Sequence, residues 1–182
     1  VSEDNKLGLA IFGQNTAKDE WDANGDGFTE LSRISGQTIG FRGYIKTGLY
    51  SKVTAEYHHL EEFRRGGDNL DLPPHEVMIA EQTKHGINTG GLKFDWFSKD
   101  QKHRLNTFAS IQHIDRESYY GAGMDPNAYG QTGDLTWVGG AQYIHKADNC
   151  LFMPADLTVG LEYNEDYLRD NMWGYDRVTD QT

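Results

Sequence analysis

The residues best suited to carry chemistry lie in the segment WDANGDGFTE, residues 21–30. Calcium prefers hard oxygen ligands on a turned backbone, and acidic or amide side chains spaced two apart before a glycine supply such a loop. The position where an EF-hand needs a bidentate Glu holds Arg33, and no amphipathic helix flanks the segment, so it is not an EF-hand. The candidate calcium ligands are Asp22, Asn24, Asp26, the Phe28 carbonyl and Glu30, completed by carboxylates elsewhere such as Asp68, Asp71 or Asp125. The alternative is a turn rich in Asp, Asn and Gly that binds nothing.

Two further segments could contact a ligand. EEFRRGGDNLDLPPHE, residues 61–76, places Arg64 and Arg65 before a Gly-Gly turn and His75 after a rigid Leu-Pro-Pro run. DRESYYGAGMDPNAYGQTGDLTW, residues 115–137, sets Tyr119, Tyr120 and Tyr129 among glycines, a composition common at binding sites. The alternatives are arginines that bridge acidic neighbours, and tyrosines that pack a glycine-rich loop.

Catalysis and nucleic-acid binding find no support in the residue types. The 7 histidines have no zinc-ligand spacing, the single Cys150 pairs with no second cysteine, and no nucleophile or phosphate-loop motif occurs. We therefore predict that the chain is not an enzyme. A net charge of -11 argues against nucleic acid, because few cations could displace counterions from phosphates.

The elements that must position these residues have the period of β-strands. Apolar and polar side chains alternate, which predicts about seven strands with one apolar, aromatic face and one charged face. The strands are expected within residues 6–13, 37–46, 52–59, 90–98, 103–113, 134–146 and 156–167.

Alternation suits a soluble β-sandwich as well as a membrane barrel, so the connections decide between them. Long connections over residues 14–33, 64–82 and 117–133, and a polar stretch from Leu168, alternate with short ones. Up-and-down outer-membrane barrels have short periplasmic turns and long external loops, and aromatic residues near their strand ends. The pattern favours an all-β, antiparallel up-and-down transmembrane barrel segment.

The loop motifs, in order, resemble those of TonB-dependent outer-membrane receptors of the vitamin B12 and siderophore branch. They are WDANGDGFTEL, TAEYHHLEEFRRGGDNLDLPPHE, IAEQTKHGINTGG, RESYYG with DPNAYGQTGDLTW, and PADLTVGLEYNEDYLRD. The resemblance implies a 22-stranded barrel in the outer membrane of a Gram-negative bacterium that imports cobalamin, haem or a ferric siderophore. It implies calcium at Asp22, Asn24 and Asp26, with Asp68 and Asp71 as weaker candidates.

On this resemblance, residues 1–182 form a partial barrel of about seven strands that lacks the plug domain. The expected partners are the large nutrient ligand, outer-membrane lipid, the TonB system through the missing plug, and a surface lipoprotein. The ending DRVTDQT, residues 176–182, is expected to be an external loop. The alternative is a secreted soluble β-domain that binds carbohydrate or protein through a calcium-stabilised loop. In that alternative the apolar face must be buried in a core, whereas in a barrel it must face lipid.

Overall fold

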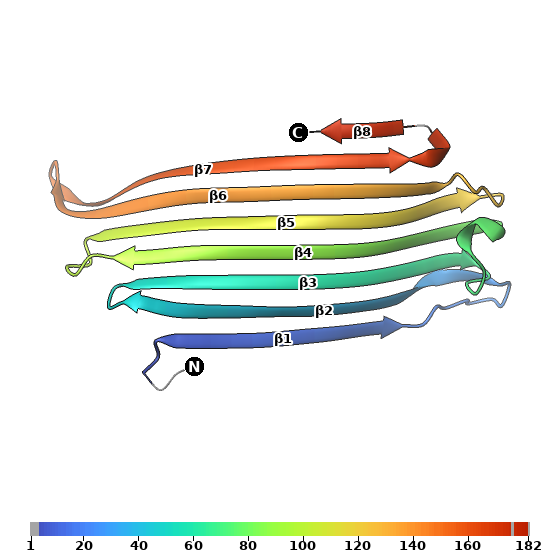
Figure 1. Ribbon diagram of the computed structural model, residues 1–182, viewed down its shortest axis with the longest axis horizontal. Coiled ribbons are helices and arrows are strands. Elements are labelled where there is room, and N and C mark those ends of the chain that lie inside the picture. Colours follow the sequence, from blue (N-terminus) through green and yellow to red (C-terminus); the bar gives the residue numbers. More distant parts are fainter. Residues whose placement is uncertain (1–3, 176, 182) are drawn as a thin grey trace.

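A computed structural model describes residues 4–175 and 177–181, which form one antiparallel sheet (Figure 1). Within these residues eight strands follow one another in the order β1 to β8, so the predicted up-and-down topology is confirmed. The sheet is open, with β1 and β8 at its edges. The strands are β1 Leu7–Lys18, β2 Phe28–Gly48, β3 Ser51–Asp68, β4 Ile79–Phe97, β5 His103–Ala122, β6 Tyr129–Cys150, β7 Met153–Met172 and β8 Arg177–Gln181, with 3-10 turns η1 Pro74–Glu76 and η2 Trp173–Tyr175.

The strands are longer and more numerous than the sequence predicts. Residues 177–181, expected in an external loop, pair with the end of β7 as β8. The long connections shrink to residues 19–27, 69–78 and 123–128, because backbone pairing continues through polar residues beyond the alternating segments. They still lie at one end of the sheet together with η2, and the short turns lie at the other (Figure 1). We call these the long-connection end and the short-turn end.

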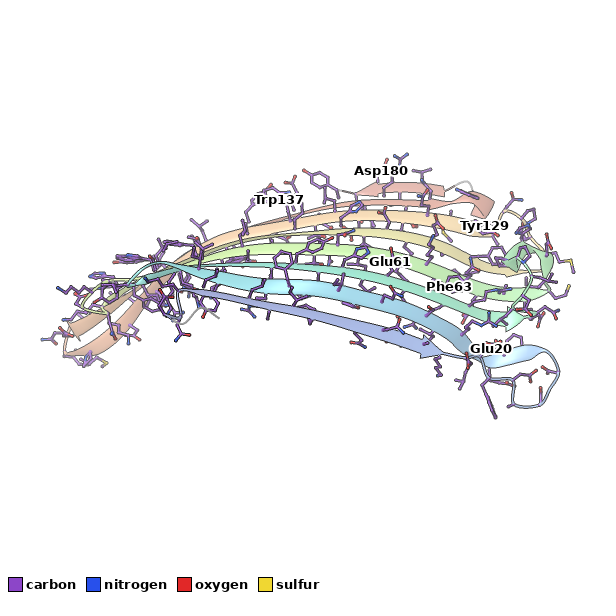
Figure 2. All side chains as sticks on the ribbon, turned by 60° about the horizontal axis from the view of Figure 1, so that its bottom comes forward. Glu20, Glu61, Phe63, Tyr129, Trp137 and Asp180 are labelled. Atoms are coloured by element: carbon purple, nitrogen blue, oxygen red, sulfur yellow. The ribbon has the colours of Figure 1, made fainter. Side chains whose placement is uncertain are left out.

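One face of the sheet carries an apolar band that is exposed to its surroundings. Because side chains alternate between faces, Leu7, Leu9 and Ile11 share this apolar face with their register neighbours on β2–β7. Ile11, Val159 and Leu161 are 71%, 66% and 72% exposed. The band covers only the half of the sheet nearest the short turns. Trp137 lies in that half, whereas Tyr129 and Glu20 lie at the opposite end (Figure 2).

Several apolar side chains, among them Phe12, Leu60, Ile87 and Phe108, interrupt the alternation on the other face, here called the polar face. Phe108 lies on it, directly opposite Gly140 in the pairing of β5 with β6. A Cβ added to Gly140 would lie 2.7 Å from the Phe108 ring, so the ring covers space that only glycine leaves open. Aromatic cover of a sheet glycine is a known way to stabilise a strand that glycine weakens. Phe108 is therefore part of the sheet packing and does not mark a change of face.

The buried core of the described residues is small and lies at the long-connection end. It consists of Val77, Ala80 and Tyr119, exposed by 2%, 4% and 0%, with Ala128 and Tyr129 packed against it. At its edge Gly67 has φ +103°, and a Cβ there would lie 2.2 Å from the Ile79 carbonyl oxygen. No helix in the described part of the chain has the length and apolar character needed to cross a membrane.

Candidate ligand-binding site

The predicted ligand-contact residues divide between the two faces of the sheet. Arg64 and Arg65 are consecutive in β3, and Tyr119 and Tyr120 are consecutive in β5, so each pair points to opposite faces. All four, with Tyr129, belong to strands and not to the loops in which they were predicted, because the ladders extend beyond the expected ends. Only His75 lies in a connection, within η1.

On the apolar face, beyond the band, Arg65 supports the β3–β4 connection. Its side chain is 2% exposed, and Nη1 donates to the Gly66 carbonyl at 2.8 Å. Nη2 lies 3.4 Å from the carbonyl oxygens of both Asp68 and Leu72. Burial lowers the pKa of this guanidinium, and the nearby Tyr119, Tyr129 and Asp68 oppose that shift. An arginine enclosed in this way holds the chain and cannot reach a ligand.

The remaining residues of this group link three connections to one another. The Tyr119 hydroxyl donates to the Asp125 carbonyl at 3.0 Å, and its ring meets Tyr129 edge-on at 4.8 Å between centroids. His75 Nδ1 lies 2.7 Å from the Tyr129 hydroxyl, and the Trp173 ring lies 5.8 Å from the Tyr129 ring. Tyr119 and Tyr129 therefore pack the connections, as the sequence alternative proposed for the tyrosines, whereas His75 bonds to Tyr129 with 38% of its side chain exposed.

On the polar face, Arg64 and Tyr120 meet two residues that the sequence reasoning did not select, His85 and Arg116. Together with Glu62, Glu81, Gln82 and Thr83 they line a hollow of about 340 Å³, here called the polar-face hollow. Register explains the meeting, because Glu62, His85 and Arg116 are direct neighbours across β3, β4 and β5. The sequence contained one signal for them, the alternation of side chains along each strand, which puts His85 and Arg116 on the same face as Arg64 and Tyr120.

The two arginines of the hollow differ in how they are paired. Arg64 Nε donates to Glu62 Oε1 at 2.8 Å, so its charge is matched by a carboxylate. Arg116 Nη2 donates to the Tyr120 hydroxyl at 2.8 Å, and its guanidinium carbon lies 5.8 Å from the centre of that ring. Arg116 Nε is buried without a hydrogen-bond partner, and within the described residues no carboxylate pairs with this guanidinium. Arg116 is thus the group in the hollow that is best placed to donate hydrogen bonds to a ligand oxygen.

His85 lies beside this guanidinium, and its surroundings disfavour the protonated imidazole. Burial lowers its pKa from the ordinary 6.5, and the positive charges of Arg116 and Arg64 lower it further, against the opposing effect of Glu62. A neutral imidazole can donate one hydrogen bond and accept another. The hollow therefore offers a free cation, a phenol and a neutral imidazole side by side, a set suited to a polar ligand with at least one acidic or carbonyl oxygen.

The predicted calcium residues lie in the β1–β2 connection, where backbone donors occupy their oxygens. Asp22 Oδ1 accepts from the Gly25 nitrogen at 2.7 Å and the Asn24 nitrogen at 3.2 Å, and Oδ2 accepts from Gly27 at 2.8 Å. The Gly27 hydrogen bond is the largest cause of the lowered pKa of Asp22. Glu30 Oε2 accepts from the Ala23 nitrogen at 2.7 Å. These bonds fold the segment into a tight loop.

The other proposed ligands lie near this loop without completing a metal shell. Asn24 Nδ2 donates to Asp26 Oδ2 at 3.0 Å, and the Phe28 nitrogen donates to Asp26 Oδ1 at 2.9 Å. Asp68 is opposite Phe28 in the β2–β3 register, and Asp71 lies 4.0 Å from Arg33. Within residues 4–175 and 177–181 no three His, Cys, Asp or Glu side chains are grouped to hold a metal. Calcium at this loop remains a prediction.

Arg33, at the position that excludes an EF-hand, has its own partner. Its Nε and Nη2 donate to the two carboxylate oxygens of Glu20 at 2.8 and 2.6 Å. This two-point pair lowers the pKa of Glu20 to about 2. It closes the base of the β1–β2 connection, where Trp21 also bonds to Leu31 through the backbone.

Comparison of the chain with known proteins identified no relative. No family model matches the chain, nor does any curated protein or solved structure. The resemblance to TonB-dependent receptors therefore rests on the order of the loop motifs.

Proposed function

We propose that the chain forms part of the wall of an outer-membrane barrel of the TonB-dependent receptor type, which captures and imports a large scarce nutrient. Cobalamin, haem or a ferric siderophore would be the ligand, contacted through the polar-face hollow. The observation that carries the proposal is the exposed apolar band on one face of a single-layered sheet.

The dimensions of the band suit a bilayer. On β7 the apolar positions of this face extend from Met153 to Tyr163, eleven residues, or roughly 36 Å along the strand at ~3.3 Å per residue, which a strand tilt of about 45° reduces to a height of roughly 25 Å. Lipid-facing bands of outer-membrane barrels are about 25 Å tall and are bordered by aromatic residues. Tyr57, Trp137 and Tyr163 lie along the border nearer the long connections, and Trp96 and Tyr143 along the other border. A soluble sandwich would instead need a second layer over these side chains.

The position of the hollow agrees with the same orientation. It lies on the face opposite the apolar band and beyond the band, near the long connections. With lipid against the apolar face, the polar face lines the interior, and the long connections point to the exterior. A ligand arriving from outside would then reach Arg116 and Tyr120 before it meets the part of the wall that lies within the membrane.

The open edges set a requirement for this function. Within the described residues, β8 pairs only with Leu168–Met172 of β7, so most of β7 and the outer side of β1 present free backbone groups. Each unsatisfied group costs several kcal/mol in lipid. The functional barrel therefore needs further strands along both edges.

Quenching of tryptophan fluorescence by brominated lipid tests the orientation. The chain is refolded into phosphatidylcholine vesicles with brominated acyl chains, using variants that retain one tryptophan each. Trp96 and Trp137 lie on the apolar face within the band and are 37% and 38% exposed. We expect both to be strongly quenched.

Trp21 and Trp173 are the matched controls, because they lie in or beside connections at the other end and are each 60% exposed. They should be quenched weakly by brominated lipid and strongly by aqueous acrylamide. Equal quenching of all four tryptophans, or a chain that folds cooperatively in water without lipid or detergent, would refute the membrane orientation.

Ligand binding is tested separately with cyanocobalamin, haemin and a ferric catecholate siderophore, by titration of the chain in detergent micelles. Arg116→Ala should raise the Kd of the ligand about 10- to 100-fold, since a hydrogen bond to a charged group contributes ~1.5–3 kcal/mol. Arg42→Ala is the control, because Arg42 lies on the same face but pairs with Glu56 at 3.7 Å outside the hollow. Equal losses from both variants would remove the hollow from the proposal.

A further inference from the structure

The polar face carries a second charged surface, at the short-turn end of the sheet. Four cationic side chains, one from each of the strands β2 to β5, line a groove of about 490 Å³. They are Lys46, Lys52, Lys93 and Arg104, and we call their surface the basic groove. The chain as a whole has a net charge of -11, so this local excess of positive charge is opposite in sign to the composition.

The basic groove contains too little negative charge to balance its cations. Its one lining carboxylate is Asp95, which is 6% exposed and lies 3.2 Å from Lys93 Nζ and 4.0 Å from Lys52 Nζ. The Asn106 amide also donates to Asp95, so little acceptor capacity remains. Asp95 therefore balances the charge of Lys93 and part of the charge of Lys52, and the rest of the groove stays positive.

The other cations face repulsion instead of a counterion. Lys46 is directly opposite Lys52 in the β2–β3 register, and like charges at such positions destabilise a sheet. In the part of the chain that the structure describes, neither Lys46 nor Arg104 has a carboxylate within ion-pair distance. Arg104 lies over the Phe97 ring at 5.0 Å. Apart from the 4.0 Å contact of Lys52 with Asp95, no ion pair in the described sheet offsets this repulsion, which an anionic partner would relieve.

The spacing of the cations indicates what kind of anion fits. Neighbouring strands lie about 4.8 Å apart, so the three steps from β2 to β5 span roughly 14 Å. One phosphate or carboxylate could bridge two of these positions but not four. Only Lys46 and Lys52 are in one row across the strands; Lys93 and Arg104 are displaced from that row by two residues, in opposite directions. Same-side residues of an extended peptide repeat about every 7 Å, so two or three acidic side chains could reach cations spread over this area. A lipid headgroup is disfavoured because the groove is on the face opposite the apolar band.

We infer that the basic groove binds an acidic polypeptide segment that lies across β2–β5 on the polar face. The inference goes beyond ligand capture, since the groove lies at the opposite end of the sheet from the polar-face hollow. It relies on the proposed function only for excluding lipid.

Fluorescence anisotropy tests the inference with the full 182-residue chain in zwitterionic detergent micelles. The probe is a fluorescein-labelled Glu-Gly repeat peptide, compared with a Gln-Gly repeat of the same length. We expect the acidic peptide to bind, and added salt to weaken it, because exposed charges are screened. Lys46→Gln combined with Lys52→Gln should raise the Kd at least about tenfold, since it removes two adjacent cations. This variant should be no less stable than the wild type, because it removes a repulsive pair.

The control combines Lys18→Gln with Lys99→Gln, which changes the net charge equally at exposed lysines outside the groove. It should leave the Kd within about twofold, a shift of less than ~0.5 kcal/mol. Equal weakening by both double variants would show diffuse attraction and overturn the inference. Equal binding of the Gln-Gly peptide, or stronger competition by inorganic phosphate or phosphatidylglycerol vesicles at equal charge, would overturn it too. Tryptophan quenching reads out orientation independently, so the two proposals can fail separately.

Discussion

Tyr119 and Tyr120 are consecutive and chemically identical, yet the structure assigns them opposite roles. Tyr119 is 0% exposed within the small core at the long-connection end, and Tyr120 is 50% exposed on the polar face. We therefore predict that Tyr119→Ala lowers the stability of the chain severely and that Tyr120→Ala does not.

The magnitudes follow from what each side chain touches. Truncation of a buried aromatic residue to Ala costs ~3–5 kcal/mol, because packing is lost and a cavity remains. Tyr119 should fall in this range, since its ring contacts Tyr129 and the core. Tyr119→Phe removes only the hydrogen bond to the Asp125 carbonyl and should cost about 1 kcal/mol. Tyr120→Ala removes an exposed ring and its hydrogen bond to Arg116, and should lower the free energy of unfolding by only ~0.5–1 kcal/mol.

Urea unfolding in detergent micelles measures these differences, with tryptophan fluorescence as the signal. Trp173 is a local reporter, because its ring lies 5.8 Å from that of Tyr129. The expected order of unfolding midpoints is wild type, then Tyr120→Ala and Tyr119→Phe close together, then Tyr119→Ala far below. If Tyr120→Ala and Tyr119→Ala destabilised the chain equally, the assignment of faces in β5 would be wrong, and with it the polar-face hollow.

Three further predictions concern the connections at the same end. The pKa of Glu20 is lowered to about 2 by its bond to Arg33, so this pair should order the β1–β2 connection above about pH 4.5 and lose its effect as pH falls towards 2. Amide hydrogen exchange should show this loss, and Glu20→Gln should reduce the pH dependence to the part that comes from Asp22, whose pKa is lowered by its backbone hydrogen bonds. If the loop binds calcium, Asp26→Ala should weaken binding at least about tenfold in a calcium titration, and an unchanged affinity would remove the metal from the account. Gly67→Ala should cost more than ~1 kcal/mol of stability because its φ is +103° and a Cβ would clash with backbone, whereas Gly86→Ala, with open space around it, should be nearly neutral in urea unfolding.

The alternation of side chains made the sheet predictable, and the same alternation explains where the prediction stopped. Strands with apolar residues at every second position, such as that around Leu157 and Val159, were located correctly. Residues 177–181 were missed because a short polar strand has no apolar period and is defined by pairing with β7. The strand ends near Arg64 and Tyr119 were placed too early for a related reason, since backbone ladders continue where side chains turn polar.

The candidate site was half predictable. Residue type alone selected Arg64, Arg65, Tyr119 and Tyr120 equally, although one member of each pair is packing and the other lines the hollow. To tell the packing residue from the hollow residue in each pair, one must know which alternate positions of the strand lie on the face of the apolar band. His85 and Arg116 could not be added before the register was known, because their neighbours are on other strands.

The division of each strand into two lengths connects the fold to the proposed function. A strand that faced lipid along its whole length would need apolar residues at every second position throughout. On one face of β3, however, Val53 and Tyr57 are followed by Glu61 and Arg65. Under the proposed function the half of the sheet beyond the band would stand in water, and the buried core and the hollow occur together in that half. A rigid core on one face holds the strands whose opposite face presents Arg116 and Tyr120. On this reasoning the proposed nutrient site forms in the long-connection half, because there the sheet is supported by packed side chains and is open to solvent at once.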